Sequence, residues 1–412
     1  MPETEQNQAE PVLEVVRSSR VQDVRLVETC AQLRLGVSDL LSGEGPLAID
    51  AERASGFKYS QRAYLIQAFR VGGPILLIDP IAISAENPDD FTWMQQQLEH
   101  LEWIIHAATQ DIPCLAELGL RPKKLFDTEL AGRLAGFERV GLGAMVAKCL
   151  GFQLAKEHSA VDWSTRPLND SWLTYAALDV DVLPELRDAL EAELTQQEKL
   201  AWALEEFEML TGFEPKPQKP DKWRGMSGLN LVKDQRQLAI ARSMWQARET
   251  LAQKLDVSPS RLLPDSSIVE AVTAKTRSRA ELNANKKFAG RASRSYLDLW
   301  WSAYESGSAT NDLPPLRIPA AGIPNHRAWP TKFPEADARL AALRGGMTIL
   351  SEKHGIPPEN LLSPDWVRTL AWENCSADEE ALSQRLAQLG ARKWQVSVTS
   401  RVLSGALAAL QP

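Results

Sequence analysis

The chain has 412 residues, with 46 Lys and Arg against 54 Asp and Glu and a net charge of −8. This length exceeds one ordinary domain and is enough for two or three domains with sizeable cores. Residues 1–24 are acidic and polar without an apolar leader segment, and no later run of about 18 apolar residues follows. We therefore expect a disordered N-terminus over 1–24, no membrane association and a cytoplasmic location.

The cysteines are few, widely spaced and form no Cys-x2-Cys pair. This pattern argues against a disulfide framework or a zinc site and favours reduced thiols. The four positions are Cys30, Cys114, Cys149 and Cys375.

The first chemically informative segment is residues 45–52, where a Gly-Pro turn precedes a short apolar run that predicts a β-strand. Asp50 and Glu52 stand at i and i+2 of this strand and should point to the same face. Two neighbouring carboxylates need a cation or a partner Lys or Arg, because their charges repel. The apolar segments 63–69 and 75–79 predict two further strands of the same meander.

A second acidic position follows the next predicted strand. After Pro88 a helical stretch runs through Leu101, and residues 103–107 then predict a strand whose end leads to Asp111. His106 lies inside this strand-like run, and we interpret it as a structural histidine.

The third block lies in residues 171–183, which are rich in Ala and Leu and predict a helix. Tyr175 and Asp179 are four residues apart and share one face of that helix. Burying an unpaired carboxylate costs several kcal/mol, so acids at the ends of apolar elements indicate salt bridges or ligands of a hard divalent cation. A phenol one turn from such a carboxylate can hold a water molecule or help to deprotonate it.

In order and context, these blocks resemble the DEDD superfamily of 3′-5′ exonucleases, in the variant with tyrosine in the last motif, and within it the ribonuclease D family. The resemblance spans about residues 25–210. Three segments between the motifs share it: Leu65–Gln67, Leu125–Ala131 and Ser159–Leu168. Ala51 departs from the family pattern, where many relatives carry Thr, but its side chain should point away from the metals.

The resemblance implies a ribonuclease H-like α/β exonuclease domain with a mixed sheet and two divalent metal ions, Mg²⁺ or Mn²⁺. The implied roles are a bridging Asp50, completion of one metal by Glu52 and Asp179, water-mediated anchoring of the other by Asp111, and orientation of the attacking water by Tyr175. Two cations about 3.5–4 Å apart can stabilise both the attacking water and the leaving 3′-oxygen. In the loop before the last motif, we expect Asp162, Trp163 and Arg166 to order the chain, with Arg166 a candidate phosphate contact.

Two proline-rich segments, residues 211–221 and 309–332, predict extended linkers. An internal repeat follows the first linker, because residues 257–264 match residues 356–363 at an offset of 99. Each copy comes after an amphipathic helical segment, Leu238–Leu255 and Leu340–His354. The repeats resemble the helicase-and-RNase-D C-terminal (HRDC) domain, an all-α bundle associated with nucleic-acid binding, and predict two such domains over 222–308 and 333–412.

Charge is distributed unevenly along the chain. Residues 1–215 hold 18 basic and 35 acidic residues, whereas residues 222–300 hold 15 basic and 7 acidic ones. Residues 301–412 hold 11 of each, so the second repeat is neutral and is expected to serve packing. A basic stripe beside a nuclease is a plausible phosphate track. Its candidate nucleic-acid contacts are Lys275, Arg277, Lys286, Lys287 and Arg291.

Together these features predict a metal-dependent 3′-5′ exoribonuclease that releases nucleoside 5′-monophosphates. The resemblance implies single-stranded RNA 3′ ends, including transfer-RNA precursors, as substrates, and no feature of the sequence signals an obligate protein partner. Two alternatives stay open: an exodeoxyribonuclease, and a non-catalytic RNA-binding protein on a nuclease fold. Intact acids at every motif position argue against the second alternative.

Overall fold

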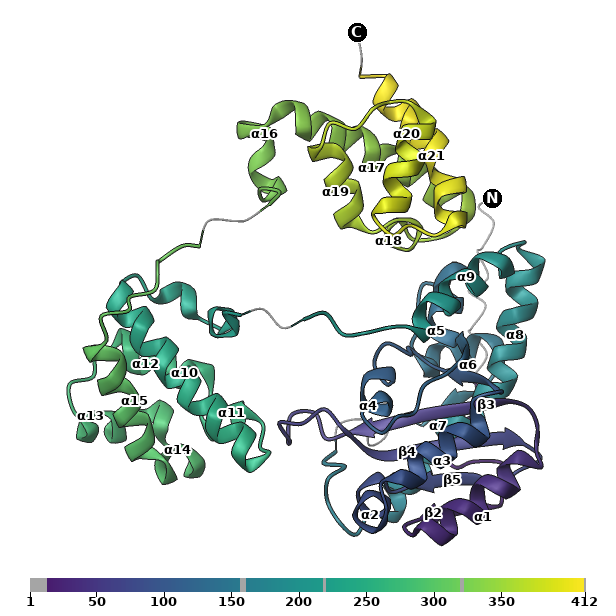
Figure 1. Ribbon diagram of the computed structural model, residues 1–412, viewed down its shortest axis with the longest axis horizontal. Helices are drawn as coiled ribbons and strands as arrows, with labels where there is room; N and C mark the ends of the chain where they lie inside the picture. Colours follow the sequence, from purple (N-terminus) through teal and green to yellow (C-terminus); the bar gives the residue numbers. More distant parts are fainter. Residues whose placement is uncertain (1–12, 156–160, 218–219, 319–321, 411–412) are drawn as a thin grey trace, which may run out of the picture.

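The computed structural model describes residues 13–155, 161–217, 220–318 and 322–410. Figure 1 shows three parts: a sheet domain (residues 13–211), a first helical domain (222–309) and a second helical domain (326–408). The predicted disorder of residues 1–12 and the first two residues of Ser159–Leu168 lie outside the described ranges. All four cysteines are free, and no described helix combines the length and the apolar character needed to cross a bilayer.

A six-stranded mixed sheet organises the sheet domain, as predicted. Its strand order is β2 (Val24–Val27), β5 (Ile75–Ile78), β4 (Ala63–Val71), β3 (Glu44–Arg53), β6 (Glu102–Ile105) and β7 (Lys124–Asp127). The β3–β4 and β4–β5 pairs are antiparallel, and the other three pairs are parallel. The predicted strands at 45–52, 63–69 and 75–79 are confirmed, and β3 lies inside the sheet, where both edges are hydrogen-bonded.

Helices cover both faces of this sheet. They are α1 (Cys30–Leu41), α2 (Pro80–Glu86), α3 (Asp89–Leu98), α4 (Ile112–Ala116), α5 (Thr128–Leu134), α6 (Leu142–Cys149), α7 (Asp170–Asp181), α8 (Leu183–Gln196) and α9 (Leu200–Thr211). One apolar cluster joins the sheet to α1, α3 and α4, and another joins it to α7. Successive side chains of β3 point to opposite faces of the sheet, as the pleat of a strand requires. Ile49 therefore packs in the first cluster and Ala48 in the second.

The prediction that the first 24 residues are disordered is wrong for residues 13–24. Strand β1 (Val15–Val16) pairs in parallel with β8 (Gln153–Leu154). The buried carboxylate of Asp181 accepts hydrogen bonds from Ser19 Oγ at 3.1 Å and from Arg20 N at 2.7 Å. A buried carboxylate needs such partners, and they fix the N-terminal segment to the sheet domain.

The first helical domain is a bundle built on one long helix. Its elements are η1 (Lys222–Gly225), η2 (Leu229–Leu231), α10 (Gln235–Leu255), α11 (Pro259–Leu262), α12 (Asp265–Thr273), α13 (Arg279–Ala284), η3 (Lys286–Phe288), α14 (Arg291–Ser295) and α15 (Leu297–Ala309). Trp300 and Phe288 are fully buried in its core. The predicted helical segment at 238–255 is confirmed.

The second helical domain repeats this plan. Its elements are η4 (His326–Ala328), α16 (Trp329–Lys332), α17 (Pro334–His354), α18 (Pro358–Leu361), α19 (Pro364–Trp372), α20 (Glu379–Gln388) and α21 (Lys393–Ala408). The predicted linker 309–332 extends too far, because residues 326–332 are helical and Trp329 is fully buried. Burial of this large indole stabilises the packing of a proline-rich segment against the bundle.

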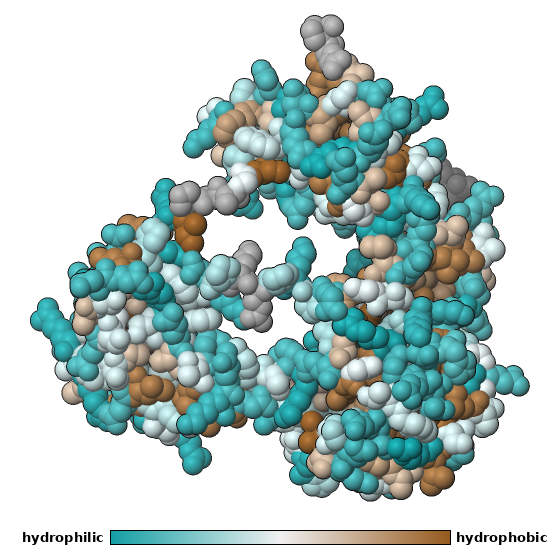
Figure 2. All heavy atoms as spheres, viewed as in Figure 1, coloured by the Kyte–Doolittle hydropathy of each residue, from teal (hydrophilic) through white to brown (hydrophobic). Residues whose placement is uncertain are grey.

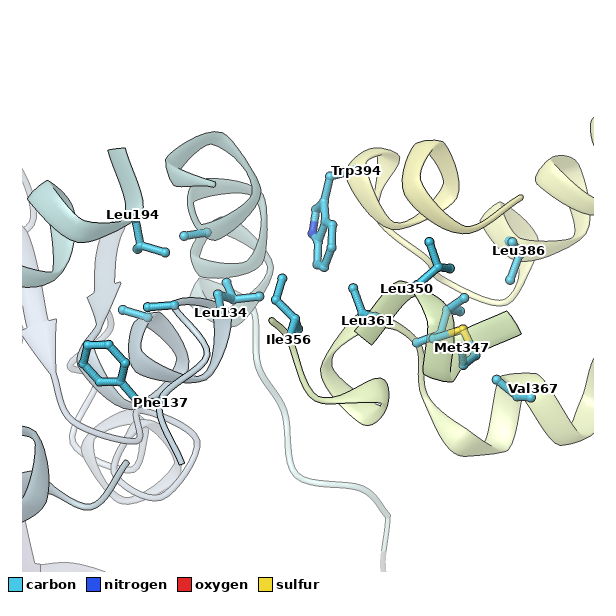
Figure 3. Close-up of a cluster of buried hydrophobic side chains, with 14 of the residues drawn as sticks. Leu134, Phe137, Leu194, Met347, Leu350, Ile356, Leu361, Val367, Leu386 and Trp394 are labelled. Carbon is cyan, nitrogen blue, oxygen red and sulfur yellow. The ribbon is translucent and has the colours of Figure 1, made fainter. Parts of the chain in front are cut away.

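The two helical domains contact the sheet domain in different ways. A continuous hydrophobic cluster joins the second helical domain to α5, α8 and α9, and Figure 3 shows Leu134 and Leu194 on one side and Ile356, Leu361 and Trp394 on the other. Backbones also approach closely there, since a Cβ at Gly136 would lie 2.2 Å from the carbonyl oxygen of Gly355. The second helical domain therefore shares a core with the sheet domain.

The first helical domain instead contacts residues 54–62, the segment between β3 and β4, which we call the docking segment. Asp256 accepts a hydrogen bond from Ser60 N at 2.8 Å, and Ser258 N donates to the carbonyl of Phe57 at 2.9 Å. Arg261 Nε donates to the carbonyl of Gly56 at 2.7 Å. Two linkers and two contact regions connect the three parts into a ring. Figure 2 shows open space at its centre.

Candidate active site

The five predicted motif residues come together in one cavity of about 360 Å³ in the sheet domain. Asp50 and Glu52 come from β3, Asp111 from the turn before α4, and Tyr175 and Asp179 from α7. Carboxylate oxygens of Asp50, Glu52 and Asp179 all lie within 4.8 Å of one another. Segments up to 129 residues apart in the sequence thus present four acids to one space.

Two local devices hold the elements that carry these acids. Buried Asp127, at the start of α5, accepts hydrogen bonds from Ala107 N at 3.2 Å and Ala108 N at 2.9 Å, which shapes the turn leading to Asp111. Arg166 forms a two-pronged ion pair with buried Asp79, at 2.6 and 2.9 Å, and fastens the loop before α7 to the sheet. Asp127 is also the N-cap of α5, where its side chain accepts a hydrogen bond from Leu130 N.

Electrostatics make this cluster costly without a cation. Burial raises the pKa of the Asp50, Asp111 and Asp179 carboxyls above the usual range. Burial, together with the charges of Asp50 and Asp179, raises the pKa of Glu52 to about 10. Four carboxylates, one buried and three partly buried, line this cavity. They match the all-oxygen ligand set that hard divalent cations prefer, so these residues fit the implied metal ions.

Tyr175 stands one helical turn from Asp179, with its ring half-buried at the cavity wall. Burial and then the charges of Asp179 and Glu52 raise the pKa of its hydroxyl. The phenol therefore keeps its proton at neutral pH and stays a hydrogen-bond donor, with Asp179 as a partner.

Other residues that line the cavity were not predicted as site residues. They are Ala51, Arg53, Ser55, His106, Ala107, Gln110, Leu142 and Leu183. His106 Nδ1 lies 2.8 Å from Thr128 Oγ1, and burial lowers the pKa of the imidazole to about 4, so it is neutral at pH 7. For Arg53, the sequence signal was its position directly after the Asp-x-Glu pair.

Gln67 pairs directly with Asp50 across β3 and β4. Its side chain is fully buried, and neither its amide nitrogen nor its amide oxygen has a hydrogen-bond partner among the described residues. Such an amide needs an ordered water or an equivalent partner.

The predicted nucleic-acid contacts lie outside the cavity. Arg166 also donates to the carbonyls of Trp163 and Tyr64, at 2.7 and 2.8 Å, so its guanidinium is engaged in loop structure and the phosphate contact stays a prediction. The remaining candidates are exposed on the first helical domain: Lys275, Arg277, Lys286, Lys287 and Arg291.

Comparison with known proteins places the site in a family. The 3′-5′ exonuclease family matches residues 24–195, the HRDC domain matches 237–304, and a 3′ to 5′ exonuclease C-terminal domain matches 322–407. Ribonuclease D of Granulibacter bethesdensis is 31% identical over 276 residues, which are 66% of this chain and 67% of that protein. The chain belongs to the ribonuclease D family. As such it is a 3′-5′ exoribonuclease with a ribonuclease H-like catalytic domain.

Other ribonuclease D proteins and solved structures agree with this assignment. Ribonuclease D of Gluconacetobacter diazotrophicus is 30% identical, and the match covers 66% of this chain and 67% of that protein. A protein from Bifidobacterium adolescentis has the same architecture, with a TM-score of 0.85, 34% identity, and coverage of 96% of this chain and 100% of that one. Escherichia coli RNase D shares the fold at 21% identity, with a TM-score of 0.65 and coverage of 95% and 100%.

Proposed function

We propose that this ribonuclease D-family enzyme removes nucleotides one at a time from RNA 3′ ends, using Asp50, Glu52, Asp111 and Asp179 to hold two divalent cations, Mg²⁺ or Mn²⁺. The observation that carries the proposal is the cluster of four carboxylates, Asp111 buried and the others partly buried, three of which present oxygens within 4.8 Å of one another. A fold that keeps repelling acids together at this cost gains from doing so only when cations are bound.

The cations, when bound, would stabilise the negative charge that develops on the attacked phosphate and on the departing 3′-oxygen. The protein supplies the rest of the arrangement. Asp50 and Glu52 are fixed by the hydrogen-bonded ladder of β3, and Asp179 by α7, so the ligands keep their spacing while RNA enters. Tyr175 holds the attacking water beside Asp179, and the 3′-terminal nucleotide occupies the remaining cavity.

RNA is the substrate that this proposal assigns, in the cytoplasm and with transfer-RNA precursors among the targets. The sheet domain is acidic, whereas residues 222–300 are strongly basic. RNA upstream of the 3′ end therefore binds the first helical domain, through Lys275, Arg277, Lys286, Lys287 and Arg291, while the end itself reaches the cavity.

The direct test uses 5′-labelled single-stranded RNA and a DNA of the same sequence, with Mg²⁺, Mn²⁺ or a chelator. We expect a ladder of products that shortens from the RNA 3′ end only when a divalent cation is present. Asp50→Asn should lower the rate about a thousandfold, because it removes a ligand charge worth several kcal/mol at the transition state.

Asp188→Asn, which neutralises an exposed acid of α8 outside the cavity, is the matched control and should leave the rate unchanged. Preferential shortening of DNA would contradict the assigned substrate. Binding of RNA without shortening would contradict catalysis.

A further inference from the structure

Arg53 is the one lining residue of the acidic cavity that carries a permanent positive charge, among the residues that the structure describes. The other basic lining residue is His106, whose pKa of about 4 leaves it neutral at pH 7. An arginine keeps its charge at any physiological pH. A guanidinium therefore stands at the wall of the space into which the RNA end must enter.

The guanidinium of Arg53 is not committed to a structural role. Nowhere in the described ranges does it form a hydrogen bond or an ion pair. Other arginines of the sheet domain differ in this respect, since Arg70 donates to the carbonyls of Leu40 and Gly45 and Arg166 pairs with Asp79. Arg53 is also only partly buried, so its donors can reach a ligand.

The pairing of β3 with β4 is irregular at Arg53. The register of β3 and β4 changes between Glu52, which pairs with Leu65, and Arg53, which pairs with Ala63. Tyr64 is the extra residue of this bulge, and bulges beside active sites commonly redirect a side chain. Glu52 and Arg53 both line the cavity, although they are consecutive in the sequence.

The residues on either side of Arg53 connect the cavity to the basic domain. Asp50 and Glu52 precede it on β3, and the docking segment follows it. That segment is anchored to the first helical domain by the bonds from Ser258 N to Phe57 O and from Arg261 Nε to Gly56 O. Arg53 therefore lies, along the chain, between the acids of β3 and the segment that contacts the first helical domain.

Charge decides what Arg53 binds. In the absence of cations, its charge favours the ionised forms of Asp50 and Asp111. Once two divalent cations occupy the acids, a guanidinium that served only as their counterion would face repulsion. An RNA phosphodiester can then serve as the negatively charged partner of the guanidinium. The planar guanidinium matches the phosphate oxygens with two parallel hydrogen bonds.

We propose that Arg53 binds a backbone phosphate of the RNA segment entering the cavity and so sets the position of the 3′-terminal linkage. This inference rests on the exoribonuclease function proposed above and adds a substrate-binding residue to it. The contact is made to phosphate, so it holds RNA of any sequence.

The test compares Arg53→Met and Arg53→Lys with the intact chain in steady-state kinetics on single-stranded RNA at saturating Mg²⁺. Arg53→Met keeps the length of the side chain and removes its charge. We expect KM to rise about ten- to hundredfold, the usual range for loss of a charged hydrogen bond, with a smaller change in kcat. Arg53→Lys should recover part of the loss. Arg344→Met removes an exposed charge of α17 and should leave KM unchanged.

A second arm identifies the group that Arg53 contacts. RNAs with a single uncharged methylphosphonate at one of the last linkages are compared between wild type and Arg53→Met. A methylphosphonate at one of these linkages should weaken RNA binding by the wild type. The same RNA should bind Arg53→Met no more weakly than unmodified RNA does, because the variant already lacks that interaction. Additive losses at every position would overturn the proposal.

A third measurement separates Arg53 from a counterion role. In the absence of RNA, Arg53→Met should change the affinity for Mn²⁺ much less than the same substitution changes the KM for RNA. Tighter Mn²⁺ binding with an unchanged KM for RNA would overturn the proposal and leave Arg53 a counterion of the acids. A wild-type chain that shortens no RNA with either metal would refute the proposed function itself, and the Arg53 contact with it.

Discussion

The two helical domains come from one repeat, yet they are joined to the sheet domain by different forces. The second is neutral and shares a continuous hydrophobic core with α5, α8 and α9. The first is basic and touches the sheet domain through hydrogen bonds to the docking segment. Hydrophobic burial scales with area, whereas each exposed polar contact contributes little. One copy has become part of the catalytic body. The other is a basic arm attached mainly by polar bonds, with Tyr59 of the docking segment packed at the edge of its core.

Removal of the Trp394 indole should have the largest effect, because this side chain lies in the core shared by the second helical domain and the sheet domain. It stacks on Trp202 of α9 with ring centroids 5.0 Å apart, and its Nε1–H donates to Glu206 Oε1 at 3.0 Å. Trp394→Ala should lower the free energy of unfolding by about 3–5 kcal/mol. Denaturant titration should show the sheet domain and the second helical domain destabilised together.

The matched control is Trp301→Ala in the first helical domain, where Trp301 stacks on Tyr304 at 5.3 Å. It should destabilise the first helical domain and leave the unfolding of the sheet domain unchanged. Equal effects of the two substitutions on the sheet domain would contradict the distinction between the domains.

The two helical domains should also differ in RNA binding. Lys286→Glu with Lys287→Glu should weaken binding of single-stranded RNA about tenfold or more, and should reduce the magnitude of the salt slope by about 1.4 if both contact phosphate. Reversal of two exposed charges of the second helical domain, Arg344→Glu with Arg401→Glu, is the control. Equal losses of RNA affinity for the two double variants, measured by fluorescence anisotropy titration, would show that both domains bind RNA.

Arg392, another basic residue of the second helical domain, is unsuitable for that control. Its guanidinium lies 2.7 Å from Glu206 Oε2, inside the contact between the second helical domain and α9. Reversing its charge would measure stability instead of RNA binding.

The polar attachment of the first helical domain predicts a smaller effect. Asp256 accepts hydrogen bonds from Ser60 N and from Tyr64 Oη at 3.2 Å, and its backbone stands at φ 48°, which glycine adopts freely. Asp256→Gly should cost about 1 kcal/mol and increase the radius of gyration in small-angle scattering, as the domain loosens. Asn374→Gly, at φ 50° in the second helical domain, should change neither quantity.

The smallest expected effect is a pH dependence at the hydrophobic contact. Burial raises the pKa of Glu206 above its usual value, against the attraction of Arg392. The folded protein therefore binds this proton more tightly than the unfolded chain, and the contribution of Glu206 to stability grows as pH falls from neutral toward the usual carboxyl pKa. The difference in unfolding free energy between wild type and Glu206→Gln should rise slightly from pH 7 to pH 5. A constant difference would contradict the raised pKa.

Features with a short-range signal were predicted correctly from the sequence. The alternation of β3 places Asp50 and Glu52 on one face, and the i, i+4 spacing of α7 does the same for Tyr175 and Asp179. The five motif residues lie in one cavity for that reason, once the sheet joins their elements. Their individual roles toward metal and RNA stay predictions.

Features that depend on long-range packing were missed. Trp301 and Trp394 look alike in the sequence, but only Trp394 meets another domain. Trp329 lies in a proline-rich stretch, and only the finished bundle shows that its indole has a place to be buried. The sequence of the docking segment looks like that of an ordinary loop. Its contact was missed because its partner Asp256 lies 196 residues from Ser60.

The measurement that tests this account most directly is native-state hydrogen exchange on the full-length chain, read by mass spectrometry with increasing denaturant. We predict that α8 and α9 open together with α17 and α21 in one cooperative unit, because they share a core. The helices α10 and α15 should open separately at a lower free energy. Independent opening of α17 and α21 while α8 and α9 stay protected would contradict the account.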